Sequence, residues 1–201
     1  MPEFEARGRH VRLPFEIREA DDDSGEFRVE GYAAVFDQET DIGGMFREVI
    51  APGAFTDAIG RDDVVFLWNH DSDTVMARTR SGTLTLEQDD RGLKMSASLD
   101  RDDPDVQRIY HKMKRGDVDK MSFAFFPEVQ EWDDSGDTPL RTIRSASLHD
   151  VSAVTHPAYD GTEIGLRSLE ETRRAVREKN RLHAAARVAR KAQAEQRFRN
   201  I

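Results

Sequence analysis

The sequence Val-Val-Phe-Leu-Trp-Asn-His-Asp, residues 64–71, is the stretch around which the rest of the chain is organised. Residues 64–68 form a short apolar run, which is typical of a buried β-strand. The run ends in polar residues, so it places one histidine, His70, at the end of that strand. Taken alone, such a histidine is more often structural than catalytic.

Two further polar residues lie downstream in similar apolar settings. Ser122 lies inside Met-Ser-Phe-Ala-Phe-Phe, residues 121–126, and Asp150 directly precedes Val-Ser-Ala-Val, residues 151–154. A hydroxyl or a carboxylate in a buried strand has a desolvation cost unless it is hydrogen-bonded. A serine, a histidine and an acid are together the side chains of a serine hydrolase, in which the histidine takes the serine proton and the acid orients the histidine.

Other interpretations use the same residues. Ser122 could be a small strand residue with a backbone partner, and Asp150 could cap a turn or pair with Arg141 or Arg144. Five residues also have side chains that can bind zinc or iron: His70, Asp71, His149, Asp150 and His156. Their spacing matches no metal-ligand signature, so we predict neither a metal nor a cofactor.

Composition limits the class of protein. The 201 residues suffice for one domain with a core, and 37% of them are hydrophobic and 34% charged. The chain has no cysteine, which excludes disulfides, thiolate zinc sites and a cysteine nucleophile. No apolar stretch approaches the roughly 20 residues of a membrane span, and we see no signal-peptide pattern. We therefore expect an intracellular protein without a membrane contact.

Charge is distributed unevenly along the chain. Residues 167–201 contain eleven Lys/Arg and four Asp/Glu, a net charge of +7, which leaves 19 against 35, or −16, for residues 1–166. An acidic body is a poor partner for nucleic acid, so no nucleic-acid binding is predicted. The basic segment is rich in Ala, Arg and Glu, which predicts a helix whose apolar stripe is too thin to fold alone.

The hydrophobic pattern predicts an α+β fold that is mainly β. Residues 15–18 and 27–36 form one predicted hairpin, with a bulge or a close backbone approach at Gly31. We predict helices over 54–60, stopped by Gly60, and between Asp102 and Gly116. We predict irregular loops over 37–44 and 127–139. The other predicted strands are 45–50, 64–68, 82–87, 92–99, 120–126, 140–144 and 148–155, of which 82–87 and 92–99 form the clearest hairpin.

Five segments together resemble the HK97-type prohead (procapsid maturation) serine proteases of tailed phages. They follow the family's order over roughly residues 14–165, and they are 31–37, 48–55, 67–71, 121–125 and 151–159. One departure is Ala77, where the family pattern leads us to expect a glycine before Arg78. The resemblance divides the chain into a flexible N-terminus at 1–13, a prohead protease domain at 14–166 and a basic helical tail at 167–201.

The resemblance also implies a fold, a site and an activity. The family is distantly similar to the herpesvirus assemblins, which implies a β-barrel flanked by a few helices. It implies that Ser122 is the nucleophile, His70 the general base and Asp150 the third member, with His149 as the alternative. Neighbouring strand residues point to opposite faces, so only one of the last two can reach His70. Backbone N–H groups, Arg78 or Arg144 remain candidates for the oxyanion donors.

The implied activity is cleavage of the scaffold, the major capsid protein and the protease itself, inside the immature capsid in the cytoplasm of the bacterial host. Because assemblins are activated by dimerisation, we expect a homo-oligomer. The alternative function is a non-enzymatic capsid-assembly module of the same fold that binds the scaffold. In that case the basic tail is the working part, whereas a solvated extension without a docking role is an equally good interpretation of it.

Overall fold

The computed structural model describes residues 5–8, 16–19, 26–155, 170, 173–179 and 181–182. The chain divides into two compact units, residues 1–162 and 163–201. The described residues of the second unit are helical and exposed, as predicted for the basic tail. The remainder of the tail, like His10, His156 and His183, lies outside the described residues.

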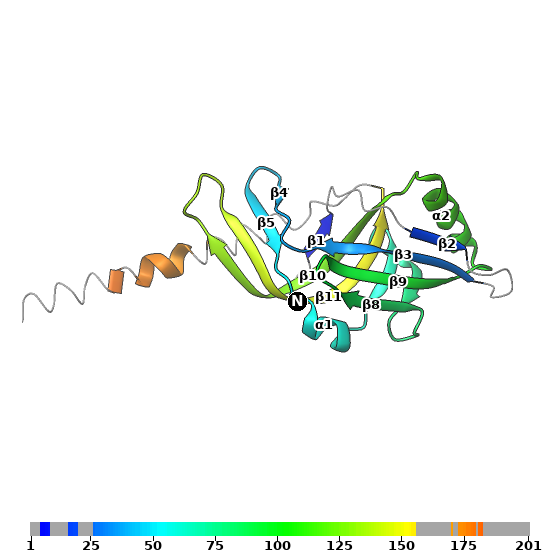
Figure 1. Ribbon diagram of the computed structural model, residues 1–201. Coiled ribbons are helices and arrows are strands. Elements are labelled where there is room, and N and C mark those ends of the chain that lie inside the picture. Colours follow the sequence, from blue (N-terminus) through cyan, green and yellow to red (C-terminus); the bar gives the residue numbers. More distant parts are fainter. Residues whose placement is uncertain are drawn as a thin grey trace, which may run out of the picture. The chain divides into compact units, whose positions relative to one another are not determined.

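The first unit is mainly β, as predicted (Figure 1). One sheet has seven strands, in the order β1-β10-β11-β5-β4, with β6 paired to β11 and β7 paired to β6. The other has four strands, in the order β2-β3-β9-β8. Neither sheet closes into a barrel within the described part of the chain. The strands are β1 (Glu5–Gly8), β2 (Glu16–Glu19), β3 (Glu26–Val35), β4 (Thr40–Ile42), β5 (Phe46–Ile50), β6 (Val65–Trp68), β7 (Asp71–Arg78), β8 (Leu84–Gln88), β9 (Gly92–Asp100), β10 (Lys120–Asp133) and β11 (Leu140–Val154).

One hydrophobic core is shared by the two sheets. It contains Val29 and Met95 from the four-stranded sheet together with Phe66, Phe123 and Val151 from the seven-stranded sheet, all of them fully or almost fully buried. Each of these residues alternates with more polar neighbours along its strand or lies in a short apolar run, which is why the sequence pattern found these strands. The core therefore anchors β6, β10 and β11, the strands that contain the candidate site residues or end next to them.

Two helices complete the described part of this unit. Helix α2 (Pro104–Arg115) begins at Asp103, whose carboxylate accepts hydrogen bonds from the N–H groups of Asp105 and Val106, and ends at Gly116 with a φ of 79°. Its buried face is the predicted one, since Val106, Ile109, Tyr110 and Met113 point into the core. Helix α1 (Thr56–Arg61) continues past Gly60, so the prediction that this glycine stops the helix was wrong.

The predicted bulge in β3 is present but lies two residues later. The pairing of β3 with β9 shifts register between Tyr32 and Ala34 rather than at Gly31. The close backbone approach belongs to the partner strand, because a Cβ on Gly92 would lie 2.0 Å from the carbonyl oxygen of Ala34. Only glycine fits there without a shift of the backbone.

The largest error of the sequence prediction concerns residues 127–139 and 140–155. The first segment is not a loop throughout, because β10 continues to Asp133, and the second is one strand rather than two. Register shifts beside Pro127 and Val129 absorb the proline, which cannot donate a ladder hydrogen bond. Three strands were also missed: β1 within the N-terminus predicted to be flexible, β4 within the predicted 37–44 loop, and β7 directly after His70.

A buried ion pair stabilises the extension of this long hairpin. Arg141, with no exposed surface, donates to Glu48 on β5 at 3.1 Å and to Gln130 on β10 at 2.7 Å. The pair links β10, β11 and β5 where these strands run together (Figure 1). An ion pair between strands that are distant in sequence leaves no local sequence pattern. Residues 127–139 were therefore predicted to form a loop.

Candidate active site

His70 lies in a tight turn between β6 and β7. Trp68 and Asp71 pair across this hairpin, so Asn69 and His70 are its two connecting residues, with φ values of 50° and 59°. A two-residue hairpin turn of type I′ requires positive φ at both positions, and Asn and His are among the side chains that tolerate it best. The two residues therefore reverse the chain between β6 and β7, with His70 at the second turn position.

The turn is attached to the end of β11. Asn69 donates its N–H to the carbonyl of Ala153 at 3.0 Å, and its side-chain oxygen accepts from the N–H of Thr155 at 3.0 Å. These two bonds connect the residue next to His70 to the strand that carries Asp150. The position of the imidazole is thus set by β11 as well as by its own hairpin.

Strand β11 lies between the strands that carry the other two candidates. It pairs antiparallel with β10, with Ser152 opposite Ser122, and parallel with β6, with Ser152 beside Leu67. Cross-strand partners share a face of the sheet, and so do residues two apart in one strand. Ser122, Ser152 and Asp150 therefore lie together on the face over which His70 turns.

The three predicted side chains form one continuous hydrogen-bonded chain. Nε2 of His70 lies 2.6 Å from Oγ of Ser122, and Nδ1 lies 2.7 Å from Oδ1 of Asp150. Ser122 is fully buried, Asp150 is nearly so, and the side chain of His70 is 13% exposed. With the Nδ1 proton on the carboxylate side, Nε2 is free to accept the serine proton, which is the tautomer a general base needs.

Sequence reasoning did not find a fourth member of this network, Ser152. Its hydroxyl donates to Oδ1 of Asp150 at 2.6 Å and lies 3.2 Å from Nδ1 of His70. It is fully buried. Its place two residues after Asp150, on the same strand face, is the signal that could have identified it.

His149, the alternative third member, lies elsewhere. Its side chain is exposed, whereas Asp150 is buried and contacts His70. Adjacent residues of an extended strand point to opposite faces, so the two cannot both reach the imidazole. Asp150, and not His149, is therefore the residue that hydrogen-bonds to His70 on the side away from Ser122.

Arg78, Arg141 and Arg144, the arginines considered above as partners of Asp150 or as oxyanion donors, each have another acidic partner. Arg141 binds Glu48, as described above, and Arg144 donates to Glu131 at 3.0 and 2.9 Å. Arg78 donates two hydrogen bonds to Asp63, at 2.9 and 2.6 Å. This fork of hydrogen bonds lowers the pKa of the Asp63 carboxyl below its usual range.

The metal interpretation of these residues finds no further support. Among the residues that the structure describes, no group of three or more His, Asp or Glu side chains is placed to hold a metal ion. His156, one of the five candidates, lies outside those residues.

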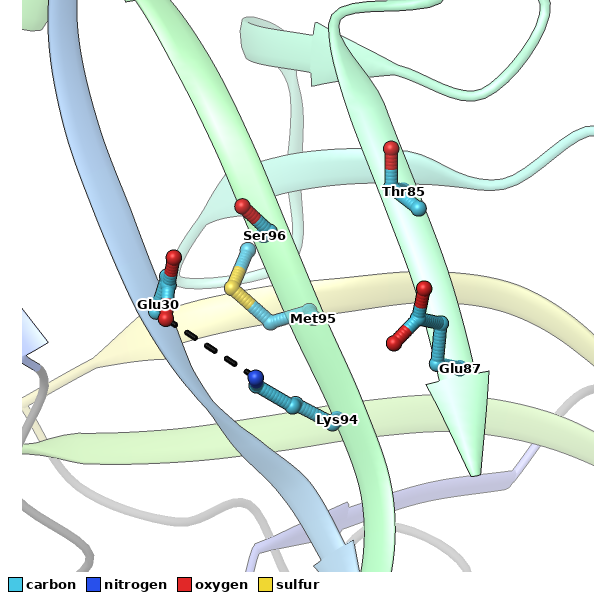
Figure 2. A pocket seen from close by; sticks show the side chains of 6 residues that line it. All are labelled: Glu30, Thr85, Glu87, Lys94, Met95 and Ser96. Atoms are coloured by element: carbon cyan, nitrogen blue, oxygen red, sulfur yellow. Dashed lines mark ion pairs between the residues drawn. The ribbon is translucent and has the colours of Figure 1, made fainter. Parts of the chain in front are cut away.

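A shallow depression of about 260 Å³ lies on the four-stranded sheet. Figure 2 shows its lining side chains, which come from β3, β8 and β9 and include an ion pair between Lys94 and Glu30 at 3.8 Å. None of the residues of the hydrogen-bonded chain lines it. We therefore place the candidate site at Ser122 and not in this depression.

Comparison with protein-family models gave a match. The model of the caudovirus prohead serine protease family matches residues 14–175, a range that includes Ser122, His70 and Asp150. The chain belongs to this family of serine peptidases, whose members mature phage capsids inside the prohead. Neither the comparison with curated proteins nor that with solved structures gave a match. No helix in the described part of the chain has the length and apolar character needed to cross a membrane.

Proposed function

We propose that Ser122, His70 and Asp150 are the catalytic triad of this capsid-maturation protease. The observation that carries the proposal is the continuous chain from Oγ of Ser122 through both ring nitrogens of His70 to the Asp150 carboxylate. This chain of contacts lies within the residues matched by the family and joins β10, β11 and the turn between β6 and β7, which are far apart in sequence.

The proposed reaction follows from these contacts. Oγ of Ser122 attacks the carbonyl carbon of the scissile peptide bond while Nε2 of His70 takes its proton. The Asp150 carboxylate, itself held by the hydroxyl of Ser152, stabilises the imidazolium that forms. His70 then gives the proton to the leaving amine, and a water molecule activated by the same nitrogen hydrolyses the acyl-enzyme. Backbone N–H groups supply the oxyanion donors in this proposal.

The proposed substrates are the scaffold, the major capsid protein and the protease itself, cut inside the immature capsid in the cytoplasm of the bacterial host. We also propose a homo-oligomer without nucleic-acid contacts, and a relationship of the two-sheet core to the β-barrel of the assemblins. The proposed division is an N-terminus at 1–13, a protease domain at 14–166 and a tail at 167–201. Membership of the prohead serine protease family supports capsid proteins as substrates. The net negative charge of residues 1–166 supports the absence of nucleic-acid contacts.

Co-expression with the neighbouring capsid and scaffold proteins tests the function. The native chain should shorten these proteins, measured by intact mass, and should react with a fluorophosphonate at Ser122, measured by peptide mapping. Ser122→Ala should abolish both, because no other hydroxyl is bonded to Nε2 of His70 among the described residues. The matched control is Ser96→Ala on the four-stranded sheet, which should change neither. Processing by the Ser122→Ala chain would contradict the proposal.

One observation favours a second function, a scaffold-binding module without catalysis. The acidic body carries a basic tail, and a basic helix complements an acidic partner. In this case triad substitutions would leave capsid assembly and protein masses unchanged, whereas removal of the tail would stop encapsidation.

A further inference from the structure

The strand that carries Ser122 has two edges, and both are paired in the structure. Along residues 120–126 one edge of β10 pairs with β11. The other edge pairs antiparallel with β1, so that Gly8 lies opposite Ser122 and Glu5 lies opposite Phe125. A segment from the N-terminus of the chain therefore covers the outer edge of β10 beside the proposed nucleophile.

This segment is not part of the matched family region. The family match begins at residue 14, so β1 lies outside it, whereas β2 to β11 lie inside. Without β1 the seven-stranded sheet would end at β10. Its terminal strand would then present unpaired N–H and C=O groups on the edge beside Ser122.

Such an edge suits an extended polypeptide. A peptide that adds a strand to a sheet gains main-chain hydrogen bonds whatever its sequence, and its alternate side chains supply specificity. Neighbouring strands lie about 4.8 Å apart, so a peptide in the place of β1 would run directly past residue 122. The side chain of Ser122 meets His70 on one face of this sheet, next to that path.

We propose that the outer edge of β10, residues 121–125, is where a polypeptide substrate pairs in antiparallel orientation, and that residues 5–8 occupy this edge as an internal competitor. The proposal rests on the proposed function of Ser122. A competing segment reduces the fraction of molecules that are open to substrate, and the apparent dissociation constant rises by the inverse of that fraction. The segment therefore raises KM and leaves kcat unchanged.

Four forms of the full chain test the proposal: native, a deletion of residues 2–9, Ala6→Pro/Arg7→Pro, and the control Ala6→Ser/Arg7→Ala. Two adjacent prolines remove the N–H that faces β10 whichever residue carries it, whereas the control keeps both N–H groups. The rate of cleavage of fluorescein-labelled casein, a disordered polypeptide, is measured against its concentration. The deletion and the double proline should lower KM about 5-fold, as expected for an edge that is covered about 80% of the time, and the control should not.

Three added measurements separate the possible results: fluorophosphonate labelling, the melting temperature and inhibition by a synthetic peptide. Fluorophosphonate labelling of Ser122 reports the catalytic site, and its absence in all four forms would refute the proposed function itself. If Ser122 is labelled in all four forms, and all four cleave casein with equal kinetics or none cleaves it, the proposed substrate edge is refuted and the proposed function stands. A lower melting temperature with slower cleavage on deletion would show that β1 is structural, which also overturns the proposal. A synthetic peptide of residues 1–13 should inhibit the deletion form, and its double-proline version should not.

Discussion

Asp150 and Glu48 are the two buried carboxylates among the described residues. Apart from the Ser152 hydroxyl, Asp150 is the only group in the described part of the chain that hydrogen-bonds to Nδ1 of His70. An amide in its place can present either its oxygen or its NH₂ group to the ring. The NH₂ group would stabilise the tautomer that protonates Nε2, which cannot accept the serine proton.

We therefore predict that Asp150→Asn slows nucleophilic attack by Ser122 about 10⁴-fold while the fold is kept. The measurement is the rate of fluorophosphonate labelling of Ser122, with circular dichroism as the check on folding. The matched control is His149→Gln at the neighbouring exposed position, which should label at the native rate. Slow labelling of the His149 variant with fast labelling of the Asp150 variant would reverse the assignment.

Ser152 acts through Asp150 in this arrangement, because its hydroxyl donates to the carboxylate that holds the histidine. Ser152→Ala removes one hydrogen bond to a buried charged group, which costs about 1.5–3 kcal/mol. We predict that kcat falls about tenfold or more while KM stays constant, since the hydroxyl has no proposed contact with substrate. Ser152→Thr should restore part of kcat because it returns the donor. A change in KM alone would contradict this positioning role.

At the scale of the elements, the extension of the β10–β11 hairpin depends on Arg141 and Glu48. Arg141→Met leaves Glu48 buried without its cation, and breaking a buried pair in this way costs about 3–5 kcal/mol. We predict a loss of that size in the free energy of unfolding, measured by urea denaturation. The double variant Arg141→Met/Glu48→Leu should recover most of the loss, because no uncompensated charge remains. Equal destabilisation by the single and double variants would mean that the loss reflects side-chain packing and not charge.

At the scale of the whole molecule, the chain consists of an acidic first unit that contains the proposed triad and a second unit that contains the basic tail. Deletion of residues 167–201 should leave fluorophosphonate labelling of Ser122 unchanged, because every described triad contact lies within residues 70–152. If the tail docks on an acidic scaffold, the same deletion should stop encapsidation, measured by the protein content of purified procapsids. Loss of labelling would instead make the tail part of the catalytic unit.

Much of the fold and the candidate site could be predicted from local patterns. The hairpin of residues 82–99 and helix α2 were found because alternation, capping and a four-residue apolar stripe are local properties. The candidates His70, Ser122 and Asp150 were found because each is a polar residue in or beside an apolar run. Their proposed roles came from the ordered motifs of a family and not from those runs.

The rest depends on which strands pair and in which register, and these are contacts between residues far apart in the chain. Only the pairing of β11 with both β10 and β6 brings Asp150 rather than His149 to His70 and adds Ser152 beside them. Only the pairing of β1 with β10 places Gly8 opposite Ser122. By itself the sequence determined a β-rich chain with three candidate side chains, because periodicity and polarity are written residue by residue. The tertiary structure decided which of these side chains meet, because a one-residue change of register would turn each of them to the other face of the sheet.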